Sequence, residues 1–155
     1  MTLSVDVRRR IGSTKLDVAF TVEAGETVAV VGPNGAGKTS LLRTIAGLSA
    51  VDDGQVTWSG SAWDDAASGA FVPPEHRPVS YVFQDHALIP HLNVLNNVAF
   101  GLRARGVRRR VAREQAMVAL NMVGGLELAD RMPSELSGGE SQSVAIARAL
   151  VAEPE

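Results

Sequence analysis

A glycine-rich stretch in the first third of the chain has the residue types and spacing of a phosphate-binding loop. Gly32 is followed after four residues by Gly37, and Lys38 and Thr39 come directly after it. In this pattern the glycines let backbone N–H groups turn toward phosphate oxygens at the positive end of a helix, and the lysine adds a cation for the outer phosphates. A threonine hydroxyl suits Mg²⁺, which takes oxygen ligands and often binds together with phosphates. The candidate binding residues are Gly32, Pro33, Asn34, Gly35, Ala36, Gly37, Lys38, Thr39 and Ser40.

The segments on either side of this loop have the composition of a strand and a helix. Residues 27–31 are a short apolar run rich in β-branched side chains, which is typical of a parallel strand buried on both faces. After the loop, leucine and isoleucine recur at helical spacing up to Ile45, and Gly47 stands where a left-handed helix end is expected. A glycine turn with a solvated lysine would also fit the loop alone. The order of strand, loop and helix favours a phosphate site.

A second helix start with accessible backbone N–H groups is predicted near the end of the chain. Ser137 is a suitable N-cap, and Gly138 and Gly139 leave the amides after it open. A periodic helix is predicted for residues 141–152, and Pro154 is expected to end it. Two helix starts able to bind phosphate in one short chain call for a common explanation.

The first part of the chain has the pattern of a small antiparallel sheet. Apolar and polar residues alternate over 3–7 and again over 16–23, which predicts two half-buried antiparallel strands. A further strand is predicted at 55–58, and residues 61–78 are interpreted as a loop with one short strand. The arginine triplet 8–10 is interpreted as a solvated edge rather than a binding patch.

The second half of the chain is predicted to be mainly helical after one more strand at 79–83, which ends at Gln84. Helices are predicted from Asn93, a possible N-cap, to residue 105, and again over 108–123. The apolar stripe of the second helix is expected to comprise Val111, Gln115, Val118 and Met122. The most basic stretch contains Arg103, Arg105, Arg108, Arg109, Arg110 and Arg113. These arginines are interpreted as a solvated helix corner, with contact to a partner or to lipid headgroups as the alternative.

The overall composition limits the possible partners. The chain has 155 residues, a net charge of −2 and no cysteine. Its length favours one hydrophobic core, and the charge gives no strong attraction to nucleic acid. The absence of cysteine excludes disulfides and thiolate chemistry for these residues. No stretch of the sequence is long and apolar enough to be predicted to span a bilayer.

Three motifs in order along the chain resemble those of the ATP-binding subunits of ATP-binding cassette (ABC) transporters. Residues 32–39 resemble the Walker A loop of that family, residues 81–85 its Q-loop, and residues 136–140 its signature motif. The resemblance implies that Lys38 and Gln84 take part in catalysis and that Thr39 and Gln84 contact Mg²⁺. In that family two subunits pair head to tail, so Ser137, Gly138, Gly139 and Glu140 would contact the ATP that is held by the Walker A loop of a second copy.

The resemblance also implies a fold and a role. The fold is expected to be α/β, with a P-loop (RecA-like) nucleotide-binding core, an antiparallel β subdomain and an α-helical insertion at about 88–140. The chain would form the N-terminal portion, residues 1–155, of a nucleotide-binding domain. It would couple ATP hydrolysis to the import of a small oxyanion, with molybdate importers as the nearest group. The implied partners are a second nucleotide-binding subunit, transmembrane permease subunits and, indirectly, a solute-binding protein. The implied location is peripheral, at the cytoplasmic face of the cell membrane.

The sequence departs from the family pattern at several positions. Glu140 stands where glutamine is typical, and Ser143 replaces an arginine. No aromatic residue precedes Phe20, so adenine stacking would fall to Ile11 or to an arginine. The sequence ends before the expected Walker B carboxylates, so these residues alone are expected to hydrolyse ATP weakly or not at all. The alternatives are an ATP-binding fragment without hydrolysis, an importer of sulfate, iron or polyamine, and a cassette ATPase with no role in transport.

Overall fold

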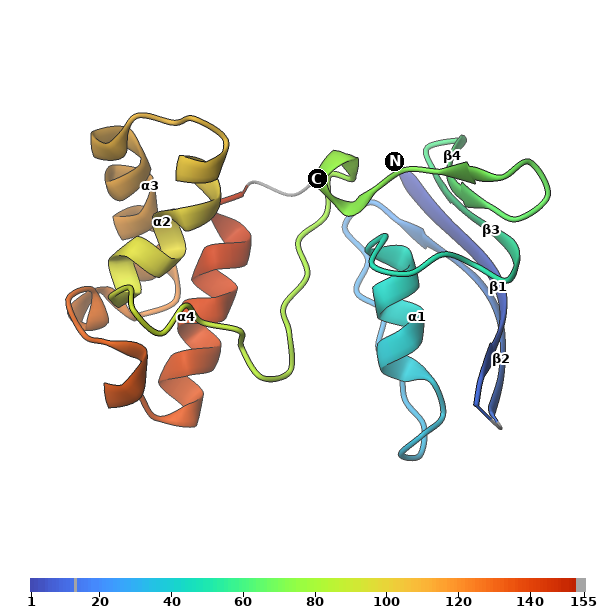
Figure 1. Ribbon diagram of the computed structural model, residues 1–155, viewed down its shortest axis with the longest axis horizontal. Coiled ribbons are helices and arrows are strands. Elements are labelled where there is room, and N and C mark those ends of the chain that lie inside the picture. Colours follow the sequence, from blue (N-terminus) through green and yellow to red (C-terminus); the bar gives the residue numbers. More distant parts are fainter. Residues whose placement is uncertain (13, 153–155) are drawn as a thin grey trace. The chain divides into compact units, whose positions relative to one another are not determined.

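The structure, a computed structural model, describes residues 1–12 and 14–152 (Figure 1). The chain divides into two compact units, with residues 1–79 in the first and the chain from Ser80 onward in the second. Each unit has its own cluster of buried apolar side chains, whereas the length alone favours one core. Pro154, which is predicted to end the last helix, lies outside the described residues.

The first unit contains a five-stranded sheet in which all neighbouring strands are antiparallel. The strands are β1 (Thr2–Ile11), β2 (Thr14–Glu23), β3 (Asp53–Trp58), β4 (Ser61–Asp65) and β5 (Ala70–Phe71), in the spatial order β2-β1-β3-β4-β5. The alternation of apolar and polar residues thus predicts β1, β2 and β3 correctly. The segment 61–78 has two strands and a 3-10 turn, η1 (Pro74–His76), rather than a single short strand.

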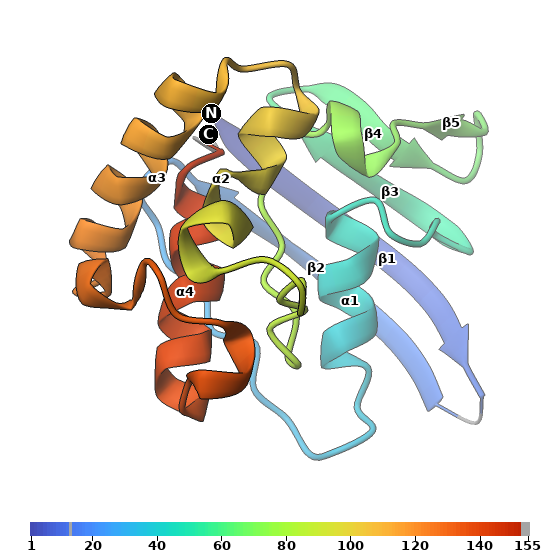
Figure 2. The same ribbon diagram turned by 60° about the vertical axis from the view of Figure 1, so that its left-hand side comes forward.

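The helix α1 (Lys38–Ile45) packs its apolar face against the sheet of the first unit (Figure 2). Its residue Leu41 is fully buried among apolar side chains of the strands, including Val5, Val7 and Val56. Burying a leucine of this kind stabilises a fold by about 1.5–3 kcal/mol. The same packing fixes where the amino-terminal end of α1 lies relative to the sheet.

The arginine triplet is only in part the solvated edge that its charge predicts. β1 lies between β2 and β3, so it is an inner strand. Arg9 points toward α1, and its Nη1 donates to the Oγ1 atom of Thr44 in that helix at 3.1 Å and to the Oγ atom of Ser49 beyond it at 2.6 Å. Only the neighbours on the other face of the strand, Arg8 and Arg10, are exposed. The alternation of the strand therefore divides the triplet between two environments.

Two predicted strands do not form among the described residues. Neither 27–31 nor 79–83 is hydrogen-bonded into a sheet, and the side chain of Val31 is 87% exposed. A parallel strand that is buried on both faces requires a hydrogen-bonded neighbour. No strand within residues 1–12 and 14–152 pairs with either segment. The apolar composition of 27–31 is therefore present without the sheet that would bury it.

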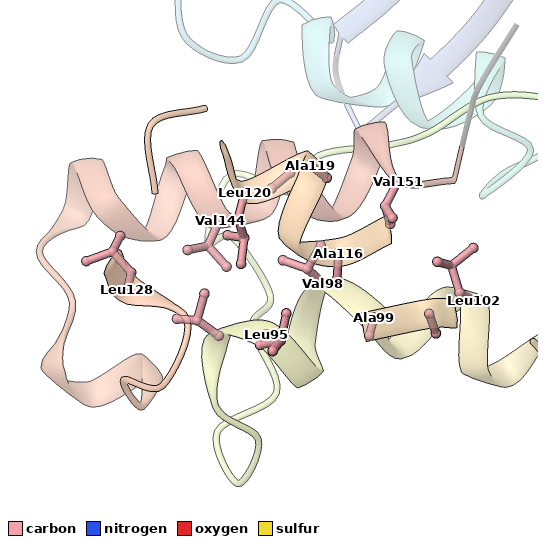
Figure 3. Close-up of a cluster of buried hydrophobic side chains, with 13 residues drawn as sticks. Leu95, Val98, Ala99, Leu102, Ala116, Ala119, Leu120, Leu128, Val144 and Val151 are labelled. Atoms are coloured by element: carbon pink, nitrogen blue, oxygen red, sulfur yellow. The ribbon is translucent and has the colours of Figure 1, made fainter. Parts of the chain in front are cut away.

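The second unit is a helical bundle. Its helices are α2 (Val94–Ala104), α3 (Arg109–Met122) and α4 (Gly138–Leu150), with the 3-10 turns η2 (Leu126–Leu128) and η3 (Pro133–Glu135) between α3 and α4. Asn93 caps α2 as predicted, since its side chain accepts a hydrogen bond from the backbone N–H of Asn96. The core of the bundle includes Leu95, Val98, Leu120 and Val144 (Figure 3). In the described part of the chain, no helix has the length and apolarity needed to cross a lipid bilayer.

The predicted apolar stripe of α3 is wrong. Val118 and Met122 are 62% and 69% exposed, and Val111 and Gln115 are exposed as well. The buried face consists of Ala112, Ala116, Ala119 and Leu120. Small side chains on this face let the α3 backbone approach α2 and α4 closely, so alanine rather than valine or methionine faces the core.

Candidate phosphate-binding site

The loop before α1 has a backbone path that only glycine adopts readily. Gly35 and Gly37 have φ angles of 82° and 92°, in the left-handed region. Gly37 is the N-cap of α1, and a Cβ atom there would lie 3.3 Å from Cδ1 of Ile11 and 3.4 Å from Cδ1 of Leu16. A side chain at this position would thus be strained in its φ angle and crowded by the sheet. The spacing of the glycines therefore has a direct geometric cause.

The Lys38 ammonium group is held at the mouth of this loop. Its Nζ donates to the backbone carbonyl oxygens of Gly32 and Pro33, each at 2.8 Å. The loop is further closed by a hydrogen bond from the Ala36 N–H to the Pro33 oxygen at 3.3 Å. A lysine that is bound only by neutral carbonyls can exchange them for anionic oxygens, which are stronger acceptors. The cation is therefore already near the place where a phosphate would lie.

The amino-terminal end of α1 is open to an anion. Gly37 supplies no side-chain cap, and within the described residues of α1 the first turn contains no acidic side chain. The first amides of a helix have no partner inside the helix, and the helix dipole makes this end positive. The backbone N–H groups of Lys38, Thr39 and Ser40 are thus donors for which the protein supplies no side-chain acceptor from the N-cap.

The oxygen ligands predicted for Mg²⁺ come from the two different units. Thr39 is exposed in the second position of α1, and Gln84 is exposed in the second unit. A hydroxyl and an amide oxygen match the preference of Mg²⁺ for oxygen ligands, with phosphate and water completing its shell. Over residues 1–12 and 14–152 no group of three or more His, Cys, Asp or Glu side chains is placed to hold a metal ion. Thr39 and Gln84 thus each offer an oxygen of the kind that Mg²⁺ prefers, one in each unit, and their roles toward a metal ion stay predictions.

The segment that contains Gln84 is attached to α4 through Arg148. The two Nη atoms of Arg148 donate to the backbone carbonyls of His86 and Ala87, each at 2.7 Å. His86 and Ala87 have φ angles of 60° and 45°, which are unusual for residues other than glycine. Burial lowers the pKa of Arg148, yet an arginine stays protonated. This role of Arg148 is not predicted from the sequence, in which the available signal is a cation on the helix that follows the signature motif.

The start of α4 differs from that of α1 because its own side chains cap it. The Ser137 Oγ accepts from the Glu140 N–H at 3.3 Å, and the Glu140 Oε2 accepts from the Ser137 N–H and Oγ, each at 2.7 Å. Arg131 lies 3.4 Å from the other Glu140 oxygen. The hydrogen bonds from Ser137 hold the pKa of Glu140 below its ordinary value, and Arg131 adds to this. The N-cap predicted at Ser137 is confirmed, and Gly138 and Gly139 are exposed.

The predicted residues of any one motif lie in the same unit, but the motifs are divided between the two units. Residues 32–40 form the loop and first turn of α1 in the first unit, and residues 137–140 form the first turn of α4 in the second. Gln84 belongs to the second unit as well. The predicted roles of these residues toward a nucleotide stay predictions.

Comparisons with known proteins agree with the motifs. The sequence model of the family described as ABC transporter matches residues 16–155. The chain is 45% identical over 139 residues to the Fe(3+) ions import ATP-binding protein FbpC 1 of Rhizobium meliloti (strain 1021), which covers 90% of the chain and 38% of that protein. It is 44% identical over 152 residues to the molybdenum import ATP-binding protein ModC of Paramagnetospirillum magneticum, with 98% of the chain and 41% of that protein covered.

A third relative is named for a different solute. The spermidine/putrescine import ATP-binding protein PotA of Mannheimia succiniciproducens is 44% identical over 135 residues, with 87% of the chain and 35% of that protein covered. The chain thus spans between 35% and 41% of the length of these relatives. Together with the family match over most of its residues, they show that the chain belongs to the ABC transporter family and has the P-loop α/β fold of its ATPase domain.

Proposed function

We propose that this chain belongs to the ATP-binding subunit of an importer, in which ATP binding and hydrolysis are coupled to transport of a solute. The observation that carries the proposal is the start of α1, where open backbone amides and the Lys38 ammonium group converge on one loop. The relatives named above, each called an import ATP-binding protein, support the same role.

In this proposal the residues of the chain act mainly by positioning and by charge. The loop amides and Lys38 would bind the phosphates of ATP, and the Thr39 hydroxyl and Gln84 would supply oxygen ligands to the Mg²⁺ that accompanies them. Bound Mg²⁺ would supply charge neutralisation on the phosphate oxygens. Phosphoryl transfer to water depends largely on such positioning and electrostatic stabilisation.

A second copy of the subunit would complete the site. Ser137, Gly138, Gly139 and Glu140 at the start of α4 would contact ATP held by the loop of the other copy, in head-to-tail order. Because the outer phosphate would bridge the copies, its hydrolysis would release them. The same order-and-release cycle would drive permease subunits, with a solute-binding protein delivering the solute. These partners place the subunit at the cytoplasmic face of the membrane.

For the solute we propose a small oxyanion, with molybdate as the first candidate. This choice follows the resemblance of residues 79–101 to importers of small anions, the further resemblance of residues 16–18 and 130–131 to molybdate importers, and the similarity to the ModC relative. The relatives named for iron and for spermidine and putrescine favour those solutes as the second candidates.

Nucleotide binding by the 155-residue chain tests the first proposal. We expect the chain to bind Mg-ATP and the Lys38→Ala variant to bind it at least about tenfold more weakly, because a charge-assisted contact to phosphate is lost. Lys15→Ala removes an exposed lysine on β2 and is the matched control, which should bind as the unaltered chain does. Titration calorimetry measures both. A chain that binds no ATP, or equal binding by Lys38→Ala, would contradict the proposal.

The solute is tested in the cell that carries the gene. Deletion of the gene should reduce the uptake of labelled molybdate and leave the uptake of iron, sulfate and putrescine unchanged. Loss of uptake of one of the other solutes would replace molybdate by that solute. Restoration by the Lys38→Ala gene would contradict a role for ATP in the transport.

A further inference from the structure

Arg77 is a buried cation at the carboxyl-terminal end of α1. The residue is 3% exposed, and it follows η1 at the end of the first unit. Removing a guanidinium group from water is costly unless its N–H donors find acceptors. Its surroundings therefore show which interactions compensate for the burial.

The guanidinium group donates to backbone carbonyls from three parts of the unit. Its Nη1 lies 2.9 Å from the oxygen of Thr44 and 2.7 Å from that of Ile45, which are among the last carbonyls of α1. Its Nη2 and Nε donate to the oxygens of Trp63 in β4, at 3.1 Å, and of Val72, at 2.8 Å. One side chain thus connects the end of α1 with the β4–β5 side of the sheet.

Aromatic rings and one carboxylate enclose the same group. The guanidinium carbon lies 5.5 Å from the ring centre of Trp63 and 5.4 Å from that of Phe71, distances at which a cation is attracted to the face of a ring. Asp64 lies 3.9 Å away and also accepts from the Val51 N–H at 3.1 Å. Burial lowers the pKa of Arg77 and raises that of Asp64, while each charge opposes the shift of the other.

Gly47 provides the space for this contact. It follows α1 with a φ angle of 76°, and a Cβ atom there would lie 2.7 Å from Nε and 2.9 Å from Cζ of Arg77. The predicted left-handed helix end is confirmed, and the structure adds a second reason for glycine. The backbone after α1 must leave room for the guanidinium group to reach the last carbonyls of the helix.

The helix α1 is only eight residues long, so contacts that hold its carboxyl-terminal end also bear on the orientation of its start. Positive charge at the carboxyl-terminal end of a helix interacts favourably with the helix dipole. The direct contacts to Thr44 and Ile45 also fix the helix against the sheet. We propose that Arg77 is a positioning residue that sets the orientation of α1 and thereby of the amides and Lys38 at its start. This inference rests on the proposed nucleotide binding by that start.

The test compares three variants of the 155-residue chain at a temperature at which circular dichroism shows each of them folded. Arg77→Met removes the charge and donors, Arg77→Lys keeps a cation with a different donor geometry, and Arg110→Met removes an exposed arginine of α3 as the control. We expect the affinity for Mg-ATP to fall about tenfold in Arg77→Met, several-fold in Arg77→Lys, and not at all in Arg110→Met. A purely structural role would lower the unfolding temperature without changing the affinity of the folded chain.

Hydrogen exchange separates this inference from the proposed function. In Arg77→Met, the amides of residues 42–48 should exchange faster while those of the β1–β3 pairing keep their protection. If the unaltered chain binds no ATP, the proposed function fails and the exchange pattern still reports whether Arg77 holds α1. If Arg77→Met binds ATP within about twofold of the unaltered chain, or if the exchange of 42–48 is unchanged, the inference is overturned. If Arg77→Met does not fold, Arg77→Lys decides, and full affinity in that variant overturns the inference.

Discussion

The two helix starts that the sequence singles out differ in how the amides of their first turn are capped. At the start of α1 the N-cap is Gly37, and the first turn has no carboxylate. At the start of α4 the N-cap is Ser137, and Glu140 in the third helical position returns a carboxylate to the cap. Both starts leave backbone amides that need acceptors. At α4 the N-cap side chain accepts from one of these amides, that of Glu140, whereas at α1 the N-cap supplies no side-chain acceptor.

This difference indicates how each start could meet an anion. A phosphate at α1 would encounter open amides and a nearby cation, so that no protein carboxylate has to move. A phosphate at α4 would encounter the carboxylate of Glu140, which is already bound to Ser137 and near Arg131. A glutamine at this position, as is typical of the family, would lack that negative charge. In this chain we therefore expect α1 to hold the nucleotide and α4 to contribute chiefly through Ser137, Gly138 and Gly139.

The largest effect is expected from exchanging a glycine at each start for alanine. Gly37→Ala would place a Cβ at a φ angle of 92° and against Ile11, so we expect a loss of about 1–3 kcal/mol in the free energy of unfolding and no measurable ATP binding. Gly138→Ala is the matched control, because a Cβ there meets nothing within 4 Å. It should keep or slightly raise stability, since alanine favours helix. Denaturant unfolding and calorimetry measure both; equal ATP binding by the two variants would contradict the comparison.

A carboxylate placed at the start of α1, as in α4, is expected to weaken nucleotide binding. Ser40 occupies in α1 the third position that Glu140 occupies in α4. Ser40→Glu should stabilise the helix start by about 0.3–1 kcal/mol and lower the affinity for Mg-ATP about tenfold, because the new carboxylate takes the amides and repels phosphate. Ser40→Gln has nearly the same shape without the charge and should lose much less affinity. If both variants bind ATP equally, charge at the first turn is not what distinguishes α1 from α4.

Local sequence signals predict the features of this molecule that local chemistry determines. The caps at Asn93 and Ser137 depend on a side chain and an amide three residues away, and both are found as predicted. The alternation over β1 and β2 specifies one buried face, and that pairing is found as well. The left-handed helix end predicted at Gly47 is found too, because few residues other than glycine adopt that conformation.

Features that depend on distant segments are missed. The run 27–31 has the composition of a strand, but a strand also needs a neighbour, and composition does not reveal whether one is present. Arg9 is interpreted as a surface charge, and Arg77 is not singled out. In both cases the acceptors that let the side chain turn inward come from other parts of the chain. The predicted apolar stripe of α3 is wrong for a related reason. The helical period is correct, but the alanines rather than the larger side chains face the bundle core.

The smallest effect expected is a pH dependence at the start of α4. The pKa of Glu140 is lowered in the folded chain, chiefly by the Ser137 N–H, so its carboxylate stabilises the fold above the ordinary glutamate pKa of about 4.3 and loses this effect as the pH falls through the lower, folded-state value. Glu140→Gln removes the titration. The difference in the free energy of unfolding between the two chains should therefore be constant near pH 7 and shrink below about pH 4.3. In a Ser137→Ala background the pH-dependent part should be smaller but still present, because the backbone N–H remains while the hydroxyl donor is gone. Urea unfolding from pH 7 to pH 3 measures all four chains, and a difference that is the same at both ends of this range would show that Glu140 does not cap α4 as a carboxylate.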